Sequence, residues 1–362
     1  MPALQNQYNP QIAFHPGRTL ADKLEELGMG PKEFAIRTGK PEKTIIAVLK
    51  GASSITPEMA VLFEQVLHIP AHFWLNKQRN YDEFLARQAY EKVLDESSTW
   101  VQCFPYKKMV ELGWIAPKKS LPEQAQTLLA FFGVSTHLAW EAYYLHPKLK
   151  VSFRISLAHT KAPHAISAWL RQGELQAETV RVGTYVEKKL ISSLPLLKAL
   201  MVDHPQNLFQ QIQQICGEAG VKVVHTPCLP QAPIHGCTRW IKDNPLIQLT
   251  GRYKRNDIFW FTFFHEIGHI LLHGKKEIFL ENTNYEGEDK QKENEADDFA
   301  VKWTFSKQQE QKMVDYGIFT LEDIARFAQS YQTHPAMIIG RLRYRGLVPH
   351  SYGAEFIRGV EF

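Results

Sequence analysis

From about residue 19 to residue 87, hydrophobic positions are spaced for short helices that glycine or proline separates. Leu20, Leu24 and Leu27 fall on one helical face, and Gly28 follows where that helix should end. Proline suits the first turn of a helix, and glycine suits the left-handed residue after its end. The pattern therefore predicts helices over residues 19–27, 31–38, 41–50 and 57–67, and one more from residue 68 through Tyr81 and Phe84.

Helices 31–38 and 41–50 carry the residue types of a helix-turn-helix. Ala35 is small enough for two helices to cross closely, Gly39 accepts a left-handed turn, and Ile45 with Val48 anchors the second helix. An ordinary helical bundle is the alternative, but the spacing fits a helix-turn-helix at every point.

The second helix of this pair would place Glu42, Lys43 and Thr44 at the major groove of DNA. Glu42 can accept a hydrogen bond from cytosine but repels phosphates, which usually supply most of the affinity. Residues 1–90 carry 10 Lys plus Arg and 9 Asp plus Glu, and 10 − 9 leaves a net charge of only +1. We therefore expect DNA binding that uses few phosphate contacts.

The next part of the chain reads as a helical connector. Helical patterns cover residues 122–132, 162–170, 176–191 and 205–219, and four scattered tryptophans are interpreted as core. After Gly220 the alternation changes to that of short strands, over residues 221–226, 236–241 and 246–250, with a turn at Lys242-Asp-Asn-Pro. A small sheet thus precedes the next helix.

That helix, Ile258 to Leu272, is apolar on nearly every side, and we expect Asp257 to cap its start and Gly274 to end it. His265, Glu266 and His269 are among its few polar residues, and burying them unpaired would cost several kcal/mol. His265 and His269 are one turn apart, so both rings can reach one tetrahedral Zn²⁺. Glu266 lies beside them in the position of a general base that activates water.

A catalytic zinc needs a third protein ligand, and an acidic helix follows from Glu293. We predict Glu295 as this ligand because it lies beside the apolar face of Ala296 and Phe299, and Asp298 could orient a histidine. Glu293, Asp297 and Asp298 are interpreted as a solvated helix face, with the orienting role as the other possibility for Asp298. His273 is about 12 Å along the helix from His265, too far to share its metal. His235, Arg239, Arg252 and Tyr253 stay open as groups that could stabilise an oxyanion.

The composition fits a globular protein of two or three domains, with 362 residues, 44% hydrophobic and 22% charged, and a mild net charge of +4. No apolar run is long enough for a membrane span, and no secretory signal is visible, so we expect a cytoplasmic protein without a membrane partner. Its four cysteines contain no CxxC pair and should be reduced.

Two family resemblances follow from these motifs. Residues 15–88 resemble the HigA-type antitoxin branch of the lambda-repressor-like helix-turn-helix family, through His15-Pro-Gly, Gly51, Ile55-Thr-Pro-Glu and Phe73-Trp-Leu-Asn. This resemblance implies operator binding as a homodimer and a toxin partner. The second part of the chain resembles the ImmA/IrrE metallopeptidases. The resemblance lies in the run from His265 to His273, Glu295-Ala-Asp-Asp-Phe-Ala, Pro245 to Thr250, Phe261 to Phe264, and Ala168 to Glu174 in the connector. That resemblance implies zinc at His265, His269 and Glu295, with Glu266 as base.

The expected fold is mainly α with a small β-sheet. We expect a helix-turn-helix domain over residues 1–95, a helical connector over 96–215, an α+β zincin-like metallopeptidase domain over 216–310, and a helical extension over 311–362. The expected function is a zinc endopeptidase in gene regulation that cleaves a repressor or antitoxin-type protein. The alternative is a HigA-like antitoxin or repressor whose zinc domain senses or scaffolds and does not cut; the presence of Glu266 favours the peptidase.

Overall fold

The computed structural model describes residues 12–145, 162–230, 232, 234–274, 279–280, 288–317 and 320–362. The chain divides into two compact units, residues 1–96 and residues 97–362. Each unit is described by itself. In the described ranges, no helix is long and apolar enough to cross a membrane, and all four cysteines are free thiols.

The first unit is helical. Its elements are α1 (Pro16–Glu26), α2 (Pro31–Thr38), α3 (Glu42–Leu49), α4 (Pro57–Leu67) and the long α5 (Ala71–Glu96). The core lies among these helices, with Leu20, Phe34, Phe63 and Trp74 fully buried. The Thr56 hydroxyl accepts from the Met59 N–H and caps α4.

The predicted helix-turn-helix is confirmed in this unit. Gly39 ends α2 with a left-handed φ of 64°, a conformation that costs glycine little. Ala35 is buried where α2 meets α3, and Ile45 and Val48 are fully buried on α3. Because these side chains hold α3 by its inner face, the start of α3 stays on the surface.

The second unit begins with helices. They are α6 (Ser98–Val101), α7 (Tyr106–Glu111), α8 (Leu121–Phe132), α9 (His137–Tyr144), α10 (Pro163–Thr179), α11 (Glu187–Asp203) and α12 (Leu208–Glu218). The prediction of a continuous helix over residues 176–191 is wrong. Helix α10 ends at Thr179, residues 180–186 are not helical, and α11 starts at Glu187. The β-branched Val180 and Val182 and the flexible Gly183 disfavour a helix there.

A small sheet follows, built from β1 (Lys222–His225), β2 (Gly236–Ile241), β3 (Asn244–Leu249) and β4 (Phe279–Leu280). The strand order is β1-β3-β2-β4; β1 pairs with β3 in parallel, and the other pairs are antiparallel. Side chains alternate between the two faces, as the strand period requires. Ile247 and Leu249 join the main core on one face, and Leu246 packs with Ala177 of α10 on the other.

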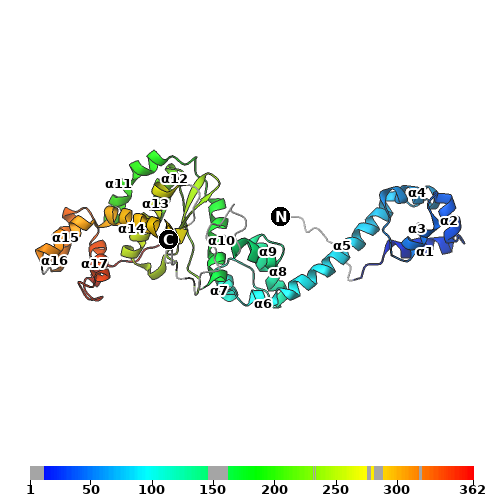
Figure 1. The fold of residues 1–362 in the computed structure, drawn as a ribbon, viewed down its shortest axis with the longest axis horizontal. Helices are drawn as coiled ribbons and strands as arrows, with labels where there is room; N and C mark the ends of the chain where they lie inside the picture. The colour runs from blue at the N-terminus through cyan, green and yellow to red at the C-terminus, as the bar shows by residue number, and fades with distance from the viewer. Residues whose placement is uncertain are drawn as a thin grey trace. The chain divides into compact units, whose positions relative to one another are not determined.

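The remaining elements of this unit are η2 (Arg252–Lys254), α13 (Asn256–His273), α14 (Glu288–Thr304), α15 (Lys307–Tyr316), α16 (Leu321–Ser330), α17 (Pro335–Tyr344) and η3 (Ala354–Phe356). Figure 1 shows α10 on one side of the sheet and α13 with α14 on the other. The largest core cluster contains side chains of α11, α12, α13 and α17 and the inner face of the sheet. The expected fold, mainly α with a small sheet, is confirmed.

Candidate metal centre

Helix α13 runs through the core of the second unit, as its apolar sequence predicts. Trp260, Phe263, Phe264 and Ile267 are all fully buried. A helix that is hydrophobic on all sides is stable only when other elements cover it. The polar residues of α13 are therefore held at fixed positions inside the protein.

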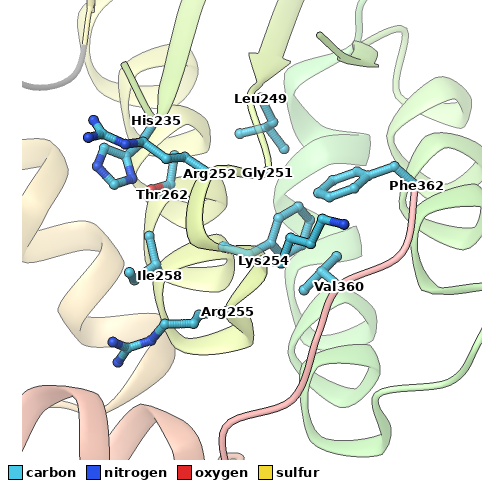
Figure 2. A pocket seen from close by; sticks show the side chains of 11 residues that line it. His235, Leu249, Gly251, Arg252, Lys254, Arg255, Ile258, Thr262, Val360 and Phe362 are labelled. Atoms are coloured by element: carbon cyan, nitrogen blue, oxygen red, sulfur yellow. The ribbon is translucent and has the colours of Figure 1, made fainter. Parts of the chain in front are cut away.

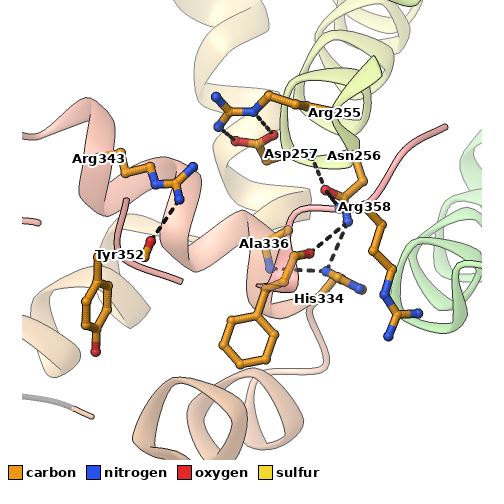
Figure 3. Close-up of polar contacts among 9 residues, drawn as sticks. Arg255, Asn256, Asp257, His334, Ala336, Arg343, Tyr352 and Arg358 are labelled. Carbon is orange, nitrogen blue, oxygen red and sulfur yellow. Dashed lines mark hydrogen bonds and ion pairs between the residues drawn. The ribbon is translucent and has the colours of Figure 1, made fainter. Parts of the chain in front are cut away.

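The start of α13 is fixed in a different way from the one predicted. The helix begins at Asn256, and Asp257 is no cap: its carboxylate pairs with the Arg255 guanidinium at 2.5 Å. Asn256 exchanges hydrogen bonds with the backbone of the C-terminal segment. Its own N–H donates to the Arg358 carbonyl at 3.0 Å, and its side-chain Oδ1 accepts from the Arg358 N–H at 3.2 Å. Figure 3 shows these contacts together with His334 at the start of α17. The predicted end is correct, since Gly274 is the C-cap residue with a φ of 74°.

His265 and His269 lie one turn apart on α13 and point their rings at a common place. The two Nε2 atoms are 2.9 Å apart. Both residues are almost fully buried, at 2% and 1% exposure. Burial, with smaller effects from His265 and His273, lowers the pKa of His269 strongly, so its ring is neutral.

Helix α14 brings a carboxylate to the same place because it packs very close to α13. Gly268 makes this approach possible: a Cβ there would lie only 3.2 Å from the Ala296 Cα. Glu293, one turn before Ala296, places its Oε2 at 3.3 Å from His265 Nε2 and its Oε1 at 3.5 Å from His269 Nε2. Among the described residues, His265, His269 and Glu293 form a group with the spacing of metal ligands.

Glu295, which we predicted as the third member, is not brought into this group. Its side chain is 46% exposed, against 18% for Glu293, and it accepts from His273 Nε2 at 3.1 Å. The helical repeat explains the difference. Glu293 shares a face with the buried Ala296 and Ala300, three and seven residues on, whereas Glu295 projects about 200° away from Glu293.

The predicted orienting residue also differs. Asp297 Oδ1 lies 2.8 Å from His265 Nδ1, while Asp298, which we considered for this role, pairs with Lys307 at 2.6 Å. Asp297 follows Glu293 by four residues, so both carboxylates reach His265 from adjacent turns of α14. His273 is not in the group but contacts it, with its Nδ1 3.0 Å from His269 Nδ1.

These contacts assign the protons on the two histidines. The Asp297 carboxylate can only accept, so His265 carries its proton on Nδ1 and leaves a lone pair on Nε2. His273 donates from Nε2 to Glu295, so its Nδ1 accepts from His269 Nδ1, and His269 Nε2 also holds a lone pair. Two lone pairs and a carboxylate that meet in a buried place repel one another unless a cation lies among them. The donor set therefore fits a metal ion.

Glu266 lies on α13 next to this group and is fully buried. Its backbone carbonyl accepts from the Thr238 hydroxyl of β2 at 3.0 Å. Gly236, at the start of β2, has no side chain where Glu266 lies: a Cβ there would be 2.6 Å from Glu266 Oε1. Strand β2 thus lies against the Glu266 carboxylate on one side, and Glu266 follows His265 by one residue and precedes His269 by three.

Of the four candidates for oxyanion stabilisation, Arg239 is committed elsewhere. It is 2% exposed and binds Glu174 at 2.8 Å and the Leu170 carbonyl, both on α10. His235 directly precedes Gly236, and Arg252 lies beside it (Figure 2). Tyr253 is 60% exposed.

In the first unit, the predicted DNA-contacting residues lie at the start of α3. Glu42 and Lys43 are exposed and Thr44 is half-buried. The structure places these side chains on the open face of the helix-turn-helix.

Comparisons with known proteins find a match for the region of the candidate metal centre and a match for the helix-turn-helix. Residues 216–342 match the family model of the IrrE N-terminal-like domain. The HTH-type transcriptional regulator YddM of Escherichia coli K12 is 33% identical over 63 residues, which are 17% of this chain and 67% of that relative.

Two solved structures are also similar. One is an addiction module antidote protein of the HigA family from Coxiella burnetii, which is 32% identical; the match covers 23% of this chain and 91% of that chain, with a TM-score of 0.22. The other is the Pseudomonas aeruginosa antitoxin HigA with the higBA promoter, which is 27% identical; the match covers 22% of this chain and 89% of that chain, with a TM-score of 0.22.

The fold and the comparisons define a protein that joins a regulator-type helix-turn-helix to a metallopeptidase-family domain. Through its N-terminal residues the chain belongs to the family of HTH-type transcriptional regulators, and its residues 216–342 are an IrrE N-terminal-like domain of the ImmA/IrrE type.

Proposed function

We propose that this chain is a zinc-dependent endopeptidase that cleaves a regulatory protein of the repressor or antitoxin type. The observation that carries the proposal is the convergence of two histidine lone pairs and the Glu293 carboxylate next to the buried Glu266. A structural metal site would have no need of a second, non-ligating carboxylate beside it.

Zinc fits the donor set in kind and in spacing. Ligand atoms that lie about 2.0–2.1 Å from a tetrahedral zinc are about 3.3–3.4 Å apart. The distances among the nitrogens and the nearest Glu293 oxygens are 2.9, 3.3 and 3.5 Å. His265, His269 and Glu293 would hold the ion, and zinc bound there would act as a Lewis acid that lowers the pKa of water and polarises a peptide carbonyl.

The protein's own residues would perform the proton transfers. Glu266 would take a proton from the attacking water and deliver it to the amine that leaves when the peptide bond breaks. Because Glu266 is buried, its carboxylate lies in a region of low dielectric constant, where nearby charges act on it more strongly than they would in water. Asp297 and the pair His273–Glu295 would keep both histidines in the tautomer that binds metal.

The decisive experiment uses a Glu266→Gln variant of the zinc-loaded protein. The variant should keep its metal and fold, because Glu266 is not a ligand, and should lose cleavage by at least about a hundredfold. Parent and variant are incubated with the proteome of the host cell, and new N-termini are identified by mass spectrometry. Glu322→Gln, an exposed glutamate on α16, is the matched control. Equal cleavage by parent and Glu266→Gln would refute the role of Glu266.

We further propose that the first unit binds operator DNA as a homodimer, through Glu42, Lys43 and Thr44 at the start of α3. The exposed start of α3 and the relation to an HTH-type transcriptional regulator support this proposal. Lys43→Ala should weaken binding uniformly across sequences and reduce the salt dependence by about one phosphate contact. Footprinting upstream of the gene tests it, with the Glu266→Gln variant in the second unit as control; no protected site in the parent would contradict it.

The alternative function is an antitoxin or repressor that binds zinc without proteolysis and pairs with a toxin. The helix-turn-helix region alone favours it. Two measurements separate these functions. The alternative predicts operator binding that depends on zinc, and it predicts no new N-termini in the proteome experiment.

A further inference from the structure

Residues 168–174 of α10, here called the α10 motif, lie against the face of the sheet opposite α13 (Figure 1). The motif is part of the resemblance to the ImmA/IrrE metallopeptidases, although the candidate metal centre contains none of its residues. Its closest approach to the sheet is at Gly173, where a Cβ would lie 2.1 Å from the Gln248 side chain of β3. The backbone of α10 therefore packs directly on the sheet.

Two polar side chains of the sheet reach across this contact to the motif. Arg239 of β2 is 2% exposed, donates to the Leu170 carbonyl and pairs with the Glu174 carboxylate at 2.8 Å. Gln248 is fully buried and donates to the Trp169 carbonyl at 2.7 Å. A carbonyl oxygen has two lone pairs, so each can accept these bonds and still take part in the helix.

The buried charge of Arg239 contributes more to position than to stability. A buried ion pair often adds little net stability compared with apolar side chains of similar volume, because both charges must leave water. Once the charge is buried, however, any displacement that separates it from its partners is costly. Arg239 therefore fixes how β2 lies against α10.

The other face of β2 contacts the proposed base. Side chains alternate along a strand, so Arg239 points to α10 whereas Gly236 and Thr238 point to α13. The Thr238 hydroxyl donates to the Glu266 carbonyl at 3.0 Å, and a Cβ on Gly236 would be 2.6 Å from Glu266 Oε1. Strand β2 thus lies between the α10 motif and Glu266, and a shift of the strand would change the surroundings of the carboxylate.

We propose that Arg239 is a positioning residue of the peptidase, which holds β2 against α10 and thereby keeps the Glu266 carboxylate in place beside the metal centre. This inference rests on the proposed peptidase function. Arg239 is buried on the sheet face that α10 covers, so it acts through Glu266 and has no part in binding the metal or the substrate. Its loss should therefore lower kcat while KM and zinc affinity stay near those of the parent.

The first experiment compares zinc-loaded Arg239→Met protein with the parent, on the protein substrate that the proteome experiment identifies. Methionine keeps an unbranched apolar side chain and removes the charge. We expect kcat to fall about tenfold to a hundredfold, because a shift of about 1 Å in a catalytic group has effects of this size. Arg239→Lys keeps a charge for Glu174 and should recover part of kcat. Glu174→Gln is a milder change, on a side chain that is 22% exposed, and should lower kcat in the same direction.

Arg171→Met is the matched control. Arg171 belongs to the same motif and pairs with the same Glu174 at 2.8 Å, but its other partner is the Phe131 carbonyl of α8 at 3.0 Å, away from the sheet. The control should keep the kcat of the parent. An equal loss of kcat in Arg171→Met and Arg239→Met would overturn the positioning role.

The native thiols provide a second measurement that needs no cleavage. Cys237 on β2 and Cys216 on α12 are both fully buried, whereas Cys103 is exposed. Alkylation with N-ethylmaleimide, mapped by peptide mass spectrometry, gives a rate for each thiol, and Cys103 calibrates the reagent. Arg239→Met should raise the rate at Cys237 about tenfold or more relative to Cys216, because β2 opens locally, whereas a general loss of stability would raise both rates.

The two measurements let the two proposals fail separately. An unchanged kcat in Arg239→Met, or equal acceleration at Cys216 and Cys237, would overturn the positioning role of Arg239. A parent that cleaves nothing would refute the peptidase; selective alkylation of Cys237 in Arg239→Met would then still support the hold of Arg239 on β2.

Discussion

Glu293 and Glu295 allow a sharp test of the metal centre, because they are two residues apart on α14 and can be changed in the same way. Glu293→Gln keeps the shape of the side chain but removes the charge of a proposed ligand. Glu295→Gln removes a charge that reaches the centre only through His273 and is 46% exposed. Loss of an outer partner typically weakens metal affinity by 10- to 100-fold, so the ligand itself should exceed that range.

We expect Glu293→Gln to lower zinc affinity by more than about a hundredfold, which is about 2.7 kcal/mol, and Glu295→Gln by about tenfold or less. Competition against a chromophoric chelator at fixed pH measures both affinities. Thermal melting with and without zinc gives an independent reading, since zinc stabilises only the protein that binds it. If Glu295→Gln loses zinc and Glu293→Gln keeps it, the sequence-based choice of Glu295 is right and our reading of the geometry is wrong.

Three further outcomes follow from the structure. Gly236→Ala should displace Glu266, because its Cβ would lie 2.6 Å from Oε1, and should reduce cleavage while zinc affinity stays near that of the parent. Burial lowers the pKa of His334 to about 4, so the unfolded chain binds the extra proton and stability should fall as the pH drops from 6.5 toward 4. His334→Asn keeps a capping side chain for α17 and should flatten this decline in pH-dependent melting; an unchanged slope would contradict it. Trp260→Ala should cost about 3–5 kcal/mol in urea unfolding, and a loss below about 1 kcal/mol would show that the core around α13 is not packed as described.

The sequence predicts most of what depends on neighbours along the chain. Ala35, Gly39 and Ile45 specify the helix-turn-helix through local spacing, and the apolar run around His265 specifies a buried helix. These features depend on helical periodicity and on turn residues, which are visible in one dimension.

The third residue of the candidate metal centre could not be predicted in this way, because its position depends on how α14 is rotated against α13. Apolar residues near Glu295 suggested an inward position, but Gly268 and Ala296 set the contact, and this contact turns Glu293 toward the histidines. The sequence did contain one indication that Glu293 faces inward: it precedes the buried Ala300 by seven residues, which is two helical turns. The boundaries predicted inside the second unit, at residues 215 and 310, remain predictions.

The close contact of Gly268 with Ala296 has a consequence for how this site can vary. The candidate ligands on α13 and α14 are registered by direct helix contact, which acts independently of the pairing of β4 with β2 between the two helices. A single methyl group at position 268 would have to move one helix by a few tenths of an ångström. Homologous centres should therefore keep small residues at this crossing.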